Sequence, residues 1–129
     1  MTSIVKTLKS FADFVSLPPV PKGEIAKAEA KLSLTFAPEY RDYISAFGAA
    51  AANGRELTGL ANSERLNVIN VTIREWGLNS QVPRSMYVVE NTAIDGIVIW
   101  QDASGVVFKS SPNAAPTAIA DSLAEYMRK

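Results

Sequence analysis

Apolar side chains recur at helical spacing at the start of the chain. Four of them are separated by four, three and four positions and would share one side of an opening helix: Ile4, Leu8, Phe11 and Val15. Pro18, Pro19 and Pro21 follow, and proline ends a helix because it lacks the amide proton and clashes with the preceding turn. The pattern therefore predicts a helix that continues through Val15 and stops before the prolines.

Two more helices are predicted before any strong strand signal. The first spans residues 22–32, with Ile25, Ala28 and Leu32 facing inward and Lys27 and Lys31 facing outward. The next begins at Pro38, which suits a first helical turn, and ends near Gly48. Its apolar stripe consists of Tyr40, Tyr43, Ile44 and Phe47.

The middle of the chain gives mixed signals. We expect the alanines of residues 49–52 to extend or cap the third helix, and residues 56–60 alternate enough to predict a short strand. Residues 62–77 contain several β-branched side chains, which favour a strand. Helical spacing nevertheless relates Leu66, Ile69, Ile73 and Trp76, and Gly77 is placed to end a helix. We therefore predict a helix here.

The clearest strand signals come late in the sequence. Residues 86–90, 97–101 and 106–110 are separated by two short segments that contain the Asp and Gly residues typical of tight turns. This predicts three consecutive antiparallel strands. Residues 97–100 are apolar on both strand faces, which places that strand in the middle of the sheet.

A final helix is predicted after the loop at residues 113–116, capped by Thr117 and carrying Ile119, Leu123 and Met127 on its apolar edge. The resulting order is α-α-α-β-α-β-β-β-α. This is an α+β fold, with helices packed on a small, mainly antiparallel sheet. At 129 residues the chain has the length of one domain.

Charge and hydropathy narrow the classes of partner. Lysine plus arginine number 13, as do aspartate plus glutamate, so no net field attracts nucleic acid or an anionic membrane. We expect neither as a partner. The chain has no apolar run typical of a signal peptide or a membrane span, which favours a cytoplasmic location. The oligomeric state stays open.

The sequence contains no histidine and no cysteine. The commonest general base, the usual metal ligands and every thiolate nucleophile are therefore missing, and we expect no enzyme activity, metal or cofactor. A carboxylate pair among Glu90, Asp95 and Asp102 is the one catalytic alternative. Turn formation and strand termination explain these three acids more simply.

The C-terminal half carries most of the candidate binding residues. Between residues 85 and 127, five acids accompany one base, Lys109, and could face a basic partner: Glu90, Asp95, Asp102, Asp121 and Glu125. Tryptophan is the side chain best able to anchor an interface. Trp100 is expected in the core, whereas Trp76, near a helix end, is the better candidate for exposure, with a core position as its alternative.

Several segments resemble one known family. Residues 34–44 (LTFAPEYRDYI), followed by Phe47-Gly48, resemble the L-x-L-P-x-x-Y-x-x-F helix entry of the SUKH superfamily, also called the Smi/Knr family. Further similar segments follow in the family's order: residues 56–60 (ELTGL), 87–90 (YVVE), 95–96 (DG), 99–102 (IWQD), 105–108 (GVVF) and the closing segment 119–127. The resemblance extends from Ile25 onward.

The resemblance implies a single SUKH domain over residues 1–129. Such domains occur in bacterial immunity proteins that neutralise polymorphic toxins, often nucleases, and in fungal regulators of cell-wall synthesis. Our first expectation is a non-catalytic immunity protein whose partner is a cognate toxin. A scaffold or regulatory module is the alternative, and a small carboxylate-dependent enzyme is the third.

Overall fold

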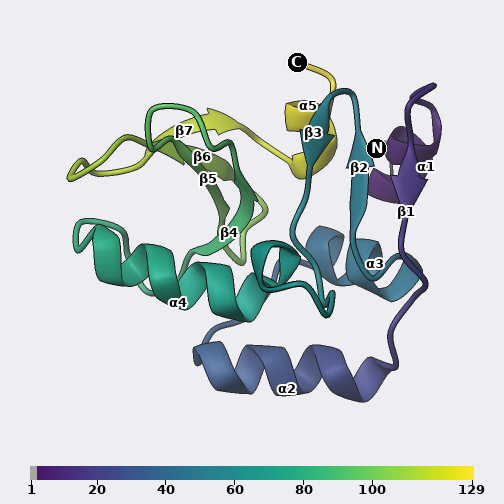
Figure 1. Cartoon of the computed structure of the whole chain (residues 1–129), viewed down its shortest axis with the longest axis horizontal. Helices are drawn as coiled ribbons and strands as arrows, with labels where there is room; N and C mark the ends of the chain where they lie inside the picture. Colours follow the sequence, from purple (N-terminus) through teal and green to yellow (C-terminus); the bar gives the residue numbers. More distant parts are fainter. Residues whose placement is uncertain (1–2) are drawn as a thin grey trace.

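The computed structural model describes residues 3–129 as five α-helices, a short 3-10 helix and seven strands (Figure 1). The helices are α1 (Ile4–Lys9), α2 (Lys22–Leu32), α3 (Pro38–Ala46), η1 (Glu64–Leu66), α4 (Val68–Leu78) and α5 (Leu123–Met127). The strands are β1 (Val15–Ser16), β2 (Ala50–Ala52), β3 (Arg55–Glu56), β4 (Tyr87–Asn91), β5 (Val98–Gln101), β6 (Val107–Ser110) and β7 (Thr117–Ala120). The α+β class predicted from the sequence is confirmed.

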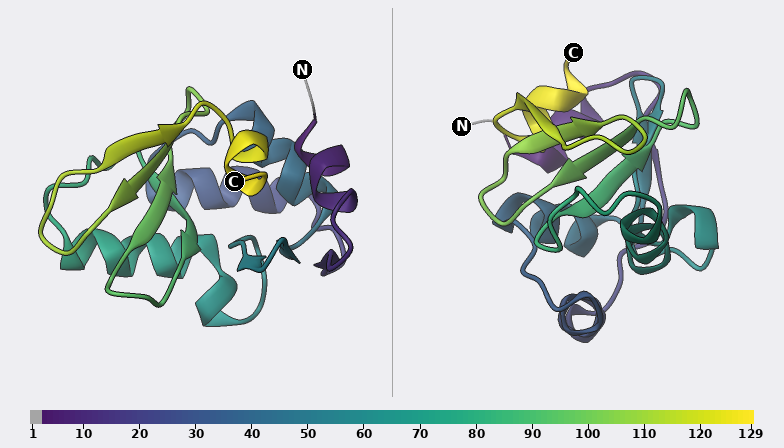
Figure 2. Two further views of the ribbon diagram at one scale, coloured as in Figure 1. Left: turned by 90° about the horizontal axis from the view of Figure 1, so that it is seen from above. Right: turned by 90° about the vertical axis from the view of Figure 1, so that its left-hand side faces the viewer.

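The strands form two antiparallel sheets, ordered β1-β2-β3 and β4-β5-β6-β7. Helix α4 packs against β4 of the four-stranded sheet, α3 packs against α1, and α2 contacts both α3 and α4. Figure 2 shows α2 end-on as the outermost layer of the molecule. No helix within residues 3–129 is both long enough and apolar enough to cross a bilayer.

Several predicted elements are confirmed. Helix α2 has the predicted bounds, and α3 begins at Pro38. The ambiguous segment is helical as α4, but this helix starts later than predicted, at Val68, and continues past Gly77, which does not end it. The three predicted consecutive strands appear as β4, β5 and β6, and β5 is an interior strand whose four residues are all buried. Periodicity succeeds here because each of these elements buries one continuous face or both faces.

The opening helix is shorter than predicted. It ends at Lys9, and Val15 pairs in β1 with Ala51 of β2. The carboxylate of Asp13 accepts the backbone N–H groups of Asn53 (2.7 Å) and Gly54 (2.9 Å). The segment before the prolines is therefore held extended along β2 by partners about 40 positions away, which helical spacing cannot reveal.

The alanine stretch does not extend α3, so that prediction is wrong. Residues 50–52 form β2, which turns through Asn53 and Gly54 into β3. Both turn residues have positive φ, 51° and 72°, as a two-residue hairpin requires. This turn chemistry overrides the helical preference of alanine.

The cap assigned to Thr117 is also wrong. Thr117 begins strand β7, which pairs with β6, and the final helix starts only at Leu123. Its cap is Ser122, whose hydroxyl accepts the N–H of Glu125 at 3.0 Å. The segment preceding the helix thus adds a fourth strand to the sheet, next to β6.

The two sheets meet at Thr58. The N–H of the preceding residue, Leu57, donates to the carbonyl of Ala50 in β2 at 2.9 Å, so this side of the chain still belongs to the small sheet. The N–H of Thr58 donates to the carbonyl of Val89 at 2.9 Å, and its hydroxyl donates to the carbonyl of Val88 at 2.8 Å. Thr58 thereby connects β3 to β4.

Two buried tyrosines of α3 hold this junction from below. Tyr43 donates to the carbonyl of Thr58 at 2.7 Å and accepts the N–H of Ala50 at 2.9 Å. Tyr40 bonds the Thr58 hydroxyl at 2.9 Å, and because that hydroxyl donates to Val88, Tyr40 acts as the donor. Both tyrosines are fully buried, and burial raises their pKa values, so they stay neutral hydrogen-bonding groups.

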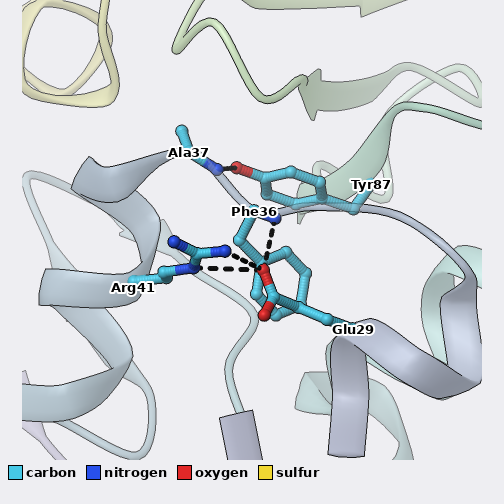
Figure 3. A network of polar contacts seen from close by, with 5 residues as sticks. All are labelled: Glu29, Phe36, Ala37, Arg41 and Tyr87. Carbon is cyan, nitrogen blue, oxygen red and sulfur yellow. Dashed lines mark hydrogen bonds and ion pairs between the residues drawn. The ribbon is translucent and has the colours of Figure 1, made fainter. Parts of the chain in front are cut away.

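The connection between α2 and α3 is fixed by a polar network that Figure 3 shows. Glu29 accepts the N–H of Phe36 at 2.8 Å and two guanidinium N–H groups of Arg41, at 2.8 and 3.1 Å. Beside it, the hydroxyl of Tyr87 in β4 accepts the N–H of Ala37 at 3.0 Å. The start of α3 is therefore anchored both to the outer helix and to the large sheet.

We predict that Thr58→Val lowers the free energy of unfolding by about 3 kcal/mol, because Val88 and Tyr40 lose a buried hydrogen-bond partner. Thr58→Ser keeps the hydroxyl and loses one methyl group, so its expected cost is about 1 kcal/mol. Urea denaturation of both variants measures the difference. Equal losses would show that the hydroxyl does not support the junction.

Candidate protein-binding site

The structure brings three of the predicted acids together at one end of the four-stranded sheet. Asp102 follows β5, and Asp121 follows β7, whose last residue is paired with the first residue of β6. Glu125 lies on α5, and its carboxylate accepts the N–H of Asp121 at 3.2 Å. Asp95 lies in the turn between β4 and β5, at the opposite end of β5, and does not join them.

A fourth acid, Asp42 of α3, comes next to this group. A cavity of about 290 Å³ is lined by Asp42 and Asp121, together with Glu39, Ser104 and Gly105. We call Asp42, Asp102, Asp121 and Glu125 the acidic end. None of the four forms an ion pair with a Lys or Arg of the described residues, whereas Glu24, Glu29, Glu56 and Glu75 each do.

Glu39 lies in the same cavity, but its carboxylate is already occupied. One oxygen accepts the N–H of Leu123 (2.6 Å) and the side-chain amide of Gln101 (2.9 Å), and the other accepts the N–H of Ala124 (3.0 Å). Glu39 thus fixes the start of α5 against α3. Sequence analysis missed it, because an acid in the first turn of a helix usually serves its own helix.

Glu90 does not belong to an exposed acidic surface, which corrects the prediction made for it. Its side chain is 8% exposed, and one carboxylate oxygen accepts the hydroxyl of Tyr126 on α5. Burial raises the pKa of Glu90, while the Tyr126 hydrogen bond and the nearby Arg55 guanidinium oppose that rise. The carboxyl is held inside the protein by the C-terminal helix.

Trp76 is in the core, the alternative that sequence analysis kept open for it. It is 7% exposed, its indole N–H donates to the carbonyl of Met86 at 3.0 Å, and the Arg84 guanidinium lies 5.0 Å from its ring centre. The expectation that Trp76 offers an exposed ring is wrong. Trp100 is fully buried, as expected.

A second polar cavity, of about 390 Å³, opens between β3 and β4. Thr58 ties the two strands together at Val88 and Val89, and beyond this junction they diverge, as Figure 1 shows. Glu56 and Thr58 line one side of the cavity, and Glu90 with residues 91–93 lines the other. We call this cavity the Glu90 pocket.

The three acids considered for catalysis are not assembled into a pair. Asp95 lies before β5 and Asp102 after it, at opposite ends of the strand, and Glu90 is bound to Tyr126. Asp102 accepts the N–H and the hydroxyl of Ser104, so it shapes the turn between β5 and β6. Among residues 3–129, no group of three or more acids is arranged to hold a metal ion.

The raised pKa of Glu90 predicts how stability depends on pH. The folded protein binds the Glu90 proton more tightly than the unfolded chain, so this contribution to stability is complete below the ordinary glutamate pKa of about 4.3. It is lost as pH rises through the folded-state pKa. The Glu90→Gln side chain is neutral at every pH. The free energy of unfolding of this variant should therefore increase relative to that of the unmodified protein as pH rises. Urea denaturation across the acidic pH range measures this, and parallel pH curves would contradict it.

Comparisons with known proteins agree with this architecture. The crystal structure of a protein from Pseudomonas syringae pv. tomato matches with a TM-score of 0.75, covering 97% of this chain and 92% of that chain at 13% identity. This likeness shows a shared fold. A search of curated proteins gave no match. The family model SUKH_5, described as SMI1-KNR4 cell-wall, matches residues 1–129. Because that match spans the whole sequence, the chain belongs to the SUKH_5 family, as the motifs in its sequence indicate.

Proposed function

We propose that this protein binds another protein without catalysing a reaction, and that its partner is a toxin that it neutralises by covering the toxin's functional surface. The observation that carries the proposal is the acidic end, where four carboxylates from α3, the β5–β6 turn, the segment after β7 and α5 gather without an ion-pair partner among residues 3–129. Carboxylates left without ion pairs on one surface attract a basic partner.

The nature of the surface supports association with a macromolecule. The acids come from four separate segments that the fold holds together, and Glu39 fixes α5 firmly beside α3. A rigid surface of one charge accelerates encounter with an oppositely charged protein, because attraction acts before contact. Toxins that act on nucleic acids carry basic surfaces for their substrate, and such a surface would match the acidic end.

The absence of histidine and cysteine from the sequence supports a non-catalytic role. Three of the carboxylates that face cavities are engaged in fixed contacts: Glu39 with the start of α5, Glu56 with Arg65, and Glu90 with Tyr126. These contacts stabilise the protein and leave the acids poorly placed for proton transfer to a substrate.

The partner can be sought in the product of the neighbouring gene, by co-expression and copurification. The protein should form a stable complex with it, and co-expression should restore growth of cells that the partner alone inhibits. Complex formation without restored growth would indicate a scaffold, and lack of any complex with the neighbouring product or other basic proteins would contradict the proposal.

We predict that Asp42→Lys combined with Asp121→Lys slows association with the partner by about tenfold at low salt, with a smaller effect at high salt because exposed charges are screened. Both side chains are exposed and make no hydrogen bond within the described residues, so the fold should be retained. The matched control is Glu24→Lys combined with Glu64→Lys, two exposed acids outside the acidic end.

Stopped-flow or surface-binding kinetics at several salt concentrations measure both double variants. Both change the net charge by the same amount, so an equal slowing would mean that overall charge, rather than the acidic end, governs association. An unchanged rate in the Asp42 and Asp121 variant would remove the acidic end from the interface.

A further inference from the structure

The Glu90 pocket contains a carboxylate that the protein itself only half uses. One oxygen of Glu90 accepts the Tyr126 hydroxyl, whereas its other oxygen, Oε2, accepts no hydrogen bond within residues 3–129. No fully enclosed side-chain oxygen or nitrogen of the described residues lacks a partner. Oε2 is therefore accessible to solvent. Glu90 is one of the residues that line the Glu90 pocket.

The other charged side chains around this pocket are paired. Arg65 donates to both carboxylate oxygens of Glu56, at 2.6 and 3.2 Å, and Arg74 donates to Glu75 at 3.2 Å. The opposite charges within each of these pairs offset one another. Among the charged side chains that line the pocket, Glu90 has no ion-pair partner within the described residues.

Arg55 is close enough to influence Glu90 but is committed elsewhere. Its guanidinium lies 4.7 Å from the centre of the Tyr126 ring and donates to the carbonyls of Met127 (3.4 Å) and Lys129 (3.2 Å). It forms no ion pair with Glu90. Arg55 thus fixes the C-terminal segment over Glu90 and leaves Oε2 open to a ligand.

We propose that the Glu90 pocket receives an arginine side chain of the partner protein, whose guanidinium donates to Oε2 of Glu90. This inference rests on the proposed function and names a contact that the acidic end does not provide. The pocket volume of about 390 Å³ falls in the range of ligand pockets, about 300–1,000 Å³. Guanidinium is chosen over ammonium because it is more weakly hydrated and has more donors for a polar cavity.

The pocket can be tested without knowing the partner. N-acetylarginine methylamide is titrated into the protein and followed by amide chemical shifts. We expect saturable shifts at Glu56, Thr58 and residues 91–93, and binding about tenfold weaker for the citrulline analogue, which has the same shape without the charge. Equal binding of the two analogues, or shifts confined to other residues, would overturn the proposal, and tighter binding of the lysine analogue would overturn the choice of guanidinium.

Variants of the two bonded residues make the same test from the protein side. Glu90→Gln should lose the arginine response, whereas Tyr126→Phe, which keeps the carboxylate, should retain it. Glu24→Gln is the matched control on an exposed acid and should bind as the unmodified protein does. If Glu90→Gln does not fold, the comparison of arginine and citrulline on the unmodified protein still decides the matter.

Once a partner protein has been identified, Glu90→Gln should accelerate dissociation of the complex by about tenfold or more, because the buried guanidinium of the partner's arginine loses its counter-charge. A complex that forms but dissociates at the unmodified rate would overturn the arginine contact and leave the proposed function standing. Failure to find any partner would contradict the proposed function, while the arginine titration would still decide the pocket.

Discussion

The fold depends on the hydrogen bonds that converge on Thr58. This residue is the point at which the small sheet and the four-stranded sheet become continuous, since its N–H and hydroxyl both reach β4. Tyr40 and Tyr43 of α3 satisfy its remaining polar groups. A polar network in a core is stabilising only when every member is bonded, and here every fully enclosed side-chain polar atom of residues 3–129 has a partner. The junction therefore specifies one arrangement of the two sheets.

The same junction positions the candidate sites. Thr58 makes the hydrogen bonds that join the chain after β3 to β4, and beyond it the two strands leave the Glu90 pocket between them. The C-terminal helix then covers the buried side of Glu90 through Tyr126, and its own start is fixed by Glu39 of α3. The acidic end and the Glu90 pocket are thus both consequences of where α3 and α5 are held.

The sequence pattern predicts the elements that bury a regular face and misses those defined by distant partners. Tyr40 and Tyr43 lie on the predicted inner side of α3, and the interior strand β5 has the predicted apolar character. The pattern predicts a helix where the structure has β1, because the partner strand β2 lies more than 30 positions away and is itself a run of alanine. Neither carries a local signal for a strand.

The candidate site divides in the same way. Exposed acids such as Asp121 and Glu125 can be recognised from local charge, and the sheet topology explains why they meet. Glu90 was grouped with them because nothing in its neighbourhood along the chain shows that Tyr126, 36 positions later, will bury it. Asp42 and Glu39 were missed because they approach the acidic end from α3, more than 75 positions before Asp121.

The two kinds of carboxylate would contribute to binding in different ways. Charges on the exposed acidic end act over distance and are weakened by salt, so they affect mainly how fast a partner arrives. The Glu90 side chain is largely buried, with Oε2 its solvent-accessible oxygen, and it has already lost much of its hydration on folding. A donor that reaches it adds attraction at little further desolvation of the acid, so this contact would affect mainly how long the partner stays. The negative charge of Glu90 has no ion-pair partner in the free protein, so a positively charged guanidinium is favoured over a neutral donor. Specificity for a basic residue then follows from the burial of this one acid rather than from the number of acids on the surface.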